Sequence, residues 1–196
     1  YVDRLQAATP ARPQGVKDAR AAGPPPPGRH YHGMAHVEAL LRWLDQSRDL
    51  ASDARAIEAA IWFHDAVYDP RSVTNEADSA QLARRELRAL QWPEQAMAKV
   101  EALVLATAGH SPGSDADEDT RLFLDLDLSI LGQAPQVYAA YSAAILAEYG
   151  HMDEAGWRAG RRRVLQSFLA KPSIYRTVRW HAAWEAQARA NIAQEL

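Results

Sequence analysis

Two pairs of ionisable residues in this 196-residue chain have the chemistry of metal ligands. His32 and His36 are four residues apart, so on a helix their imidazoles share one face. His64 and Asp65 follow five consecutive apolar residues, and burying such a pair is costly unless it is neutralised or bound to metal. Asp65 would alternatively only orient its histidine neighbour or cap a loop.

Two carboxylates, Asp125 and Asp127, interrupt a further apolar stretch at 122–131. On a helix they point about 200° apart, so one can face a buried site while the other caps the helix or faces elsewhere. Two imidazoles and two carboxylates form a donor set that suits manganese, iron, cobalt, nickel or zinc. Such a set leaves open positions for water and substrate, which is typical of a catalytic metal site.

The elements that must position these residues are helices. Apolar residues recur at three- and four-residue intervals from Tyr31 onward, and no segment alternates as a strand does. Pro93 and Pro135 suit the first turns of helices, and Asp153 and Ser173 suit N-caps. The pattern predicts an all-α single domain. About eight helices are expected, at residues 34–48, 53–68, 75–91, 94–109, 119–131, 136–149, 153–170 and 173–193.

Length and composition exclude several classes of protein. A hydrophobic fraction of 47% suffices for one globular core, and a net charge of −3 argues against a binder of nucleic-acid polymers. The chain has no cysteine, which excludes disulfide scaffolds and thiol nucleophiles, and no apolar stretch long enough for a membrane helix. No secretory signal is visible, so we expect a cytoplasmic protein without a membrane partner.

Residues 1–28 differ from the rest of the chain because they are rich in proline. A run of prolines adopts an extended polyproline II conformation and cannot join a helix. We expect an N-terminal arm or loop that acts as a spacer; a ligand for a proline-recognising partner is the alternative. The domain itself is expected at residues 29–196.

The ordered set His36, His64-Asp65 and Asp127 resembles the H…HD…D signature of the HD-domain metal-dependent phosphohydrolase superfamily. Over about residues 29–177, stretches of the chain are similar to those of an uncharacterised bacterial subgroup of HD proteins. These stretches are RHYHGMAHV, AIWFHDAVYD, NEADSA, LVLATAGH, DLDLSILG and GRRRVLQSFLAKPSIY. The resemblance implies an HD-domain helical bundle with a metal ion at its centre.

The same resemblance implies the metal ligands. Asp127 is preferred to Asp125 because relatives with an Asp-x-Asp-basic motif use the second aspartate. Leu128 stands where those relatives carry a basic residue, so a phosphate contact seen in them is missing here. The divalent ion is left open among manganese, iron, cobalt, nickel, zinc and magnesium, as is the presence of one or two ions. The implied ligands are His36, His64, Asp65 and Asp127.

Roles in catalysis follow from further similarities. The YHxxxHV stretch is similar to the start of the cyclic-nucleotide phosphodiesterase site, which implies that His32 is the general acid. Many HD enzymes carry His, Glu or Lys where this chain has Tyr68, which can donate to a phosphate oxygen but is a poor base. We therefore expect a metal-activated water, oriented by Asp65 or Glu76. Glu76 would alternatively be an ordinary carboxylate at a helix start.

Two further residues, His110 and Arg29, are candidates for contact with the substrate phosphate. His110 would be a phosphate contact, a ligand of a second metal ion or an ordinary loop histidine. Arg29 would neutralise phosphate charge, unless it is simply exposed. The adjacent Arg161, Arg162 and Arg163 point in different directions on a helix and are expected to form a solvated face.

Together these expectations describe a phosphomonoesterase or phosphodiesterase that acts on a small phosphorylated metabolite or nucleotide. Two alternatives stay open. A di-iron oxygenase on the same fold would need further ligands, which His32 and His110 could supply. A binding or regulatory module would have kept the fold and lost catalysis. A homo-oligomer also stays open.

Overall fold

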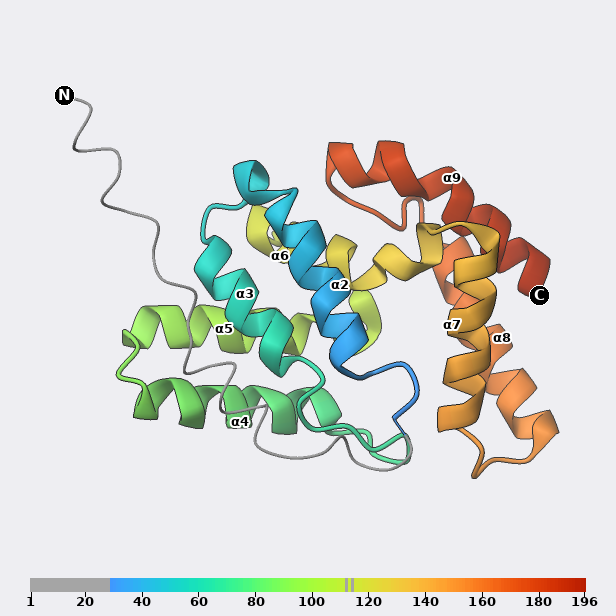
Figure 1. The fold of residues 1–196 in the computed structure, drawn as a ribbon, viewed down its shortest axis with the longest axis horizontal. Coiled ribbons are helices and arrows are strands. Elements are labelled where there is room, and N and C mark those ends of the chain that lie inside the picture. Colours follow the sequence, from blue (N-terminus) through green and yellow to red (C-terminus); the bar gives the residue numbers. More distant parts are fainter. Residues whose placement is uncertain (1–28, 112, 114) are drawn as a thin grey trace.

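The computed structural model describes residues 29–111, 113 and 115–196, and this part of the chain contains helices and no strand (Figure 1). The prediction of an all-α fold is confirmed. The arm expected at 1–28 lies outside the described residues. The α-helices are α2 (Met34–Asp45), α3 (Ala54–Phe63), α4 (Asn75–Ala89), α5 (Glu94–Ala106), α6 (Glu118–Asp127), α7 (Pro135–Glu148), α8 (Glu154–Leu169) and α9 (Val178–Glu195). Short 3-10 helices lie at Arg48–Leu50, Ala108–His110 and Leu128–Gly132.

Several helices begin at capping residues that the sequence makes recognisable. The side chains of Asp53, Asp117 and Asp153 each accept a hydrogen bond from the N–H three residues further on. A cap of this kind stabilises a helix by about 1 kcal/mol. Helix α7 begins at Pro135, whose missing N–H would have no partner in the first turn in any case. The predicted starts near 136 and 153 are therefore confirmed.

Helix α3 lies at the centre of the core. Its residues 56–63 are all buried, and it packs against α2, α4, α5 and α6. Figure 1 shows α4 and α5 lying side by side in opposite directions beneath α3. Ile57, Ile61 and Phe63 are almost fully buried, and each such side chain contributes about 1.5–3 kcal/mol. Within the described ranges, no helix combines the length and apolar character needed to cross a bilayer.

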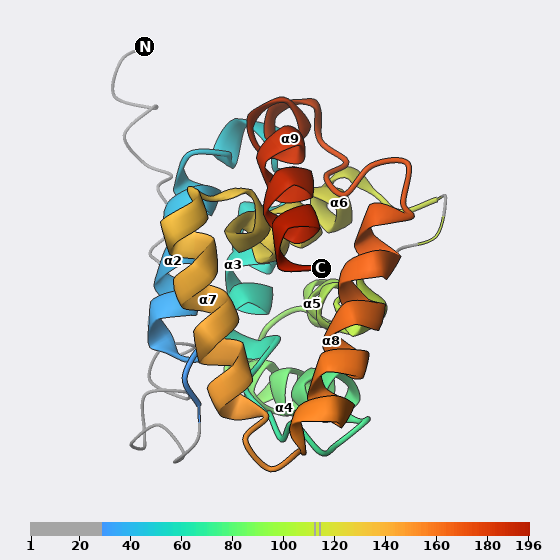
Figure 2. The same cartoon turned by 90° about the vertical axis from the view of Figure 1, so that its right-hand side faces the viewer.

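In the C-terminal half of the fold, α7 and α8 are not packed along each other as α4 and α5 are. Helices α7 and α8 leave their connecting turn on diverging paths (Figure 2). Helix α7 buries Tyr138, Ile145 and Glu148, and α8 buries Leu165 and Phe168. Tyr138, Leu165 and Phe168 join the hydrophobic core, and other side chains of both helices line a cavity.

Helix α9 packs across the short helix Leu128–Gly132, which directly follows α6. A Cβ at Gly132 would lie 2.4 Å from the Cβ of Trp184. Real Cβ atoms do not approach so closely, so only glycine permits this contact. The contact holds the chain that follows Asp127, the last residue of α6.

The two largest errors in the predicted helix boundaries are five residues each, and side chains from elsewhere explain both. Helix α3 ends at Phe63 rather than 68, because the Ser79 hydroxyl accepts the Val67 N–H at 3.0 Å and donates to the Val67 carbonyl at 3.2 Å. This bonding draws residues 64–68 away from the helix axis. The last helix begins at Val178 rather than 173, because Asp125 binds the backbone N–H groups of residues 176 and 177.

Candidate metal centre

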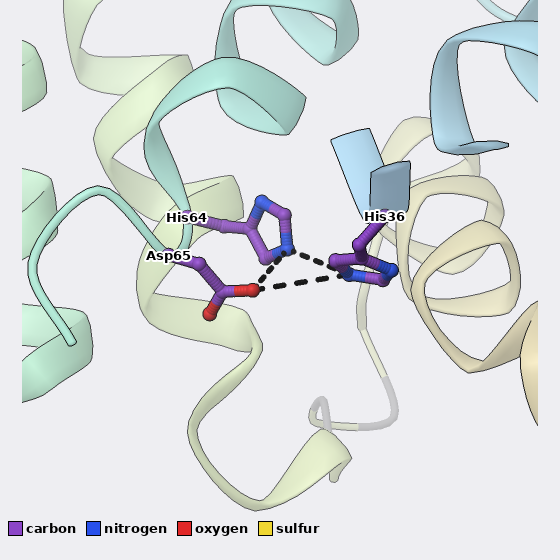
Figure 3. Close-up of side chains that lie close together, drawn as sticks. All are labelled: His36, His64 and Asp65. Carbon is purple, nitrogen blue, oxygen red and sulfur yellow. Dashed lines mark hydrogen bonds and ion pairs between the residues drawn. The ribbon is translucent and has the colours of Figure 1, made fainter. Parts of the chain in front are cut away.

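The side chains predicted as metal ligands come together where α2, α3 and α6 pack against one another. His36 lies in the first turn of α2, His64 and Asp65 directly follow α3, and Asp127 ends α6. Figure 3 shows His36, His64 and Asp65 pointing toward one another. Their potential ligand atoms all lie within 4.8 Å of one another.

The spacing of the donor atoms fits a divalent cation. The Nε2 atoms of His36 and His64 are 3.2 Å apart. Asp127 Oδ1 lies 3.1 Å from His36 Nε2 and 3.5 Å from His64 Nε2. Asp65 Oδ2 lies 3.0 Å from His64 Nε2 and 3.8 Å from His36 Nε2. Two ligand atoms bound at right angles, each about 2.1 Å from an ion, lie about 3.0 Å apart.

The orientation of the His64 ring is set by the end of α3. Its Nδ1 lies 2.9 Å from the Ile61 carbonyl oxygen. A carbonyl only accepts, so we assign a hydrogen to Nδ1, and Nε2 is the ring nitrogen that faces the cluster. Metal-bound histidines are commonly oriented in this way, by a hydrogen bond from the second ring nitrogen to a carbonyl.

The electrostatics of the cluster favour a positive charge among these side chains. Burial alone would lower the pKa of His64, but the carboxylates of Asp65 and Asp127 raise it to about 10. Burial opposes the ionisation of both aspartates, yet the neighbouring histidines hold the pKa of each below its ordinary value. Burial also lowers the pKa of His36. Without a metal ion, the positive charge is a proton on His64, and a bound cation would replace it.

The structure separates the two aspartates of α6. Asp125 points away from the cluster and accepts hydrogen bonds from the N–H of Arg176, the N–H of Thr177 and the Thr177 hydroxyl, at 2.6–2.8 Å. Burial raises the pKa of Asp125 to about 6 despite these bonds. Asp127 alone of the pair contacts the two histidines. This placement agrees with the preference for Asp127 as a ligand, a role that stays a prediction.

His110 reaches the cluster through Asp127. Its Nε2 lies 2.7 Å from Asp127 Oδ2, the oxygen that does not face the other two histidines. The backbone of His110 has a φ of 48°, and Gly109 before it has a φ of 73°. A non-glycine residue in this left-handed region stores strain, which is typical of functional sites. The Lys171 ammonium donates to the His110 carbonyl at 2.7 Å and holds this conformation.

His32 and Tyr68 meet at a carboxylate that sequence reasoning missed. Glu148, the last residue of α7, has Oε2 2.6 Å from His32 Nδ1 and 2.9 Å from the Tyr68 hydroxyl, which donates to it. The His32 and Tyr68 rings stack with centroids 4.3 Å apart. The Tyr68 hydroxyl, expected to face phosphate, is therefore engaged by Glu148. Burial raises the pKa of Tyr68, which agrees with its being a poor base.

Glu148 also binds the backbone that leads into α2. Its Oε1 accepts the N–H groups of His30, Tyr31 and His32 at 2.6–3.0 Å. Burial alone would raise the pKa of Glu148, but the hydrogen bonds from His32 and from the backbone lower it to about 2. Nothing in the local sequence signals this role, because Glu148 ends an alanine-rich helix without an apolar stripe.

Arg29, predicted to contact phosphate, lies in a different environment. Its Nη1 donates to the Asp65 carbonyl at 2.8 Å, and its Nη2 donates to the Ala66 carbonyl at 3.1 Å. Burial lowers the pKa of Arg29. Arg29 is not among the residues that line the cavity beside the cluster. These contacts favour a structural role, in which Arg29 holds the turn that carries Asp65.

A cavity of about 600 Å³ opens against the cluster. His64 is buried and does not line it. Of the predicted site residues, those in the lining are His32, His36, Asp65, Tyr68, Glu76, His110 and Asp127. Aromatic side chains supply much of the wall, namely Tyr31, Tyr141, Tyr149, Trp157 and Phe168. The cavity thus brings most of the predicted site to one space, large enough for a small organic phosphate.

The expectation that residues 161–163 form a solvated face is wrong for Arg161. Its side chain is only 10% exposed and binds both carboxylate oxygens of Glu195, at 2.8 and 3.1 Å. Arg161 and Arg163 both line the cavity. Arg163 brings positive charge to the wall formed by α8, which the sequence pattern did not indicate, whereas the charge of Arg161 is paired with Glu195.

Comparison with known proteins gives no match: none of the protein-family models, curated proteins or solved structures matches the chain. The resemblance to HD-domain enzymes is therefore a prediction that rests on the sequence motifs. A function has to be argued from the side chains around the cluster and its cavity.

Proposed function

We propose that this protein is a metal-dependent phosphohydrolase that acts on a small phosphorylated metabolite or nucleotide. The observation that carries the proposal is the buried His36–His64–Asp65 cluster, with Asp127 against it, at the wall of a cavity of about 600 Å³. Ligand cavities for small molecules have volumes of about 300–1,000 Å³. The cavity therefore suits a metabolite rather than a polymer.

Four residues would hold the ion: His36, His64, Asp65 and Asp127. A mixed nitrogen and oxygen donor set suits manganese, iron, cobalt, nickel or zinc, and magnesium is a further candidate. When bound, such an ion polarises a phosphoryl oxygen and lowers the pKa of water to around 7, so that no strong protein base is required. Tyr68 stands where a stronger base would otherwise be expected, and its raised pKa agrees with this division of roles.

The remaining side chains of the cavity would bind and orient. Asp65 and Glu76 both line it, and each can accept a hydrogen bond from the attacking water. Arg163 would supply positive charge for the substrate anion in place of Arg29, because the charge of Arg161 is paired with Glu195. His110 lines the cavity beside Asp127 and can donate to a phosphate oxygen or share its hydrogen bond with the metal ligand.

A di-iron oxygenase is less well supported by the geometry. A second metal ion needs further imidazole ligands, and in the described part of the chain His110 is the additional histidine that touches the cluster. The hydrogen-bond partner of His32 is Glu148 rather than a residue of the cluster. A binding module without catalysis would not need the four predicted ligands, all of which lie at this cluster.

Metal content and phosphate release test this proposal together. Purified protein is equilibrated with each candidate metal, freed of loose ion, analysed for bound metal and screened for phosphate release from nucleotides and sugar phosphates. We expect about one ion per chain and metal-dependent hydrolysis, both lost in His64→Ala. The exposed His181→Ala is the matched control and should keep both. Two retained ions with oxygen consumption would favour the oxygenase, and no retained ion would favour the binding module.

A further inference from the structure

We propose that Glu148 is the positioning residue of a general acid, His32, and that the natural substrate is a phosphate ester of an aliphatic alcohol. The inference rests on the proposed function and adds a residue and a substrate class to it. Glu148 lies 116 residues after His32, at the end of α7. Its carboxylate binds residues 30–32 and Tyr68, which are not members of the His36–His64–Asp65 cluster.

The backbone contacts fix where His32 stands. Three consecutive N–H groups, those of residues 30–32, converge on Oε1 of Glu148. Such a concave arrangement of amides binds an anion, here a carboxylate of the same chain. The side chain of Glu148 is fully buried, so water does not compete for these bonds. His32 is thereby held at the entrance to α2, four residues before His36.

The side-chain contacts fix which nitrogen of His32 meets the substrate. Oε2 of Glu148 lies 2.6 Å from His32 Nδ1 and accepts a hydrogen bond from it, so we assign a hydrogen to Nδ1. This nitrogen therefore faces Glu148 and not the substrate. Tyr68 stacks on the ring and donates to the same Oε2, which limits rotation of the imidazole. His32 lines the cavity. Nε2 is therefore the ring nitrogen that can reach a substrate in the cavity, and the carboxylate on Nδ1 holds the imidazole in this orientation.

The proposed step moves one proton at a defined atom. The oxygen of the attacking water forms a bond to phosphorus as the bond from phosphorus to the ester oxygen breaks. That ester oxygen takes the proton from His32 Nε2 and leaves as a neutral alcohol. One proton of the water goes to solvent, and the other stays on the oxygen that is now part of the phosphate product. His32 then regains a proton from solvent.

The substrate class follows from what a general acid is needed for. An aliphatic alkoxide is a poor leaving group, and protonating it as the bond breaks accelerates the reaction by about 10²–10⁴-fold. A nitrophenolate leaves readily as an anion, so protonation adds little. A built-in carboxylate–imidazole pair is therefore expected where the natural substrate is an ester of a sugar or other aliphatic alcohol.

The test compares two esters in the metal-loaded protein. We expect Glu148→Gln to lose about 10²-fold in kcat on an alkyl phosphate such as glycerol phosphate, and less than about threefold on p-nitrophenyl phosphate. Glutamine has one acceptor oxygen, so it cannot serve both the backbone amides and His32. His32→Gln should give the same pattern, and the double variant should add no further loss. Equal losses on both esters would overturn the proposal.

A matched control separates positioning from folding. Glu185 is another carboxylate that accepts two consecutive backbone N–H groups, those of Ile174 and Tyr175, and it does not line the cavity. Glu185→Gln should lower stability and leave the ratio of the two rates unchanged. A changed ratio in Glu185→Gln would show that loosening of the fold produces the pattern, which would overturn the role of Glu148.

A measurement without turnover keeps this inference distinct from the proposed function. Nitrogen-15 NMR of histidine-labelled protein reports the hydrogen on His32 Nδ1, and we expect its signal to change in Glu148→Gln and not in Glu185→Gln. An unchanged signal in a folded Glu148→Gln variant would refute the positioning. If the wild-type protein binds metal and hydrolyses neither ester, the proposed function fails and the general-acid role fails with it, whereas a Glu148-dependent signal would still support the contact.

Discussion

The stability that Glu148 contributes can be calculated from its surroundings and tested by pH. A pKa of about 2, against an ordinary value of 4.5, corresponds to about 3 kcal/mol of folding free energy at neutral pH. The side chain of Glu148 is fully buried, so solvent screens its interactions little. Because the folded pKa is depressed, this stabilisation is fully present above about pH 4.5 and is lost as pH falls through about 2. About 1 kcal/mol should remain at pH 3.

The assay is urea unfolding of the wild-type protein and Glu148→Gln at pH 7, 5, 4 and 3. The difference in unfolding free energy should shrink by about 2 kcal/mol between pH 7 and pH 3, because the unfolded wild-type chain binds a proton at Glu148 below about pH 4.5 and the unfolded variant cannot. Glu154→Gln is the control, since Glu154 is exposed and its pairing with Arg158 should contribute less than about 1 kcal/mol. A difference that stays constant across this range would refute the assigned electrostatics.

Other predictions concern the metal cluster. Asp127→Ala should abolish retention of the ion. Asp125→Ala should retain the ion and lower the free energy of unfolding by about 1–3 kcal/mol, because two backbone N–H groups lose their acceptor. Metal analysis and urea unfolding distinguish the two variants, and the reverse result would reject Asp127 as the ligand. Metal binding at pH 7.5 should release about one proton, since the pKa of His64 is raised to about 10 without metal and the ion displaces that proton. Apparent affinity should therefore rise as pH rises toward 10. Calorimetry in buffers of different ionisation enthalpy measures this release, and an absence of release would contradict the charge state assigned to His64.

Much of the fold was predictable because helix signals are local. Caps and a first-turn proline lie next to the turns they define, so Asp153 and Pro135 marked their helices correctly. The presence of His64 and Asp65 at one cluster was predictable for the same reason, since a His-Asp pair after an apolar run can be recognised within one segment. Even so, α3 ended early, because Ser79 from the next helix binds the backbone of Val67.

The rest of the site could not be predicted, because its contacts join distant segments. Glu148 looks like any carboxylate at the end of an alanine-rich helix, and its partners lie 116–118 residues away. Arg161 lies in an arginine run that would suit a solvated surface, but Glu195 from α9 and Tyr138 and Tyr141 from α7 contact it and bury it. Residue periodicity carries no information about such pairs.

The separation between Glu148 and its backbone partners has a consequence for the order of folding. Closing a loop of more than a hundred residues costs more chain entropy than forming any contact within α3 or between α4 and α5. The carboxylate should therefore meet residues 30–32 only after the helices have packed, so its bonds are absent from the transition state. Glu148→Gln should then accelerate unfolding while leaving the folding rate nearly unchanged. This one contact should therefore affect the rate of unfolding, and so the lifetime of the native state, far more than the rate of folding.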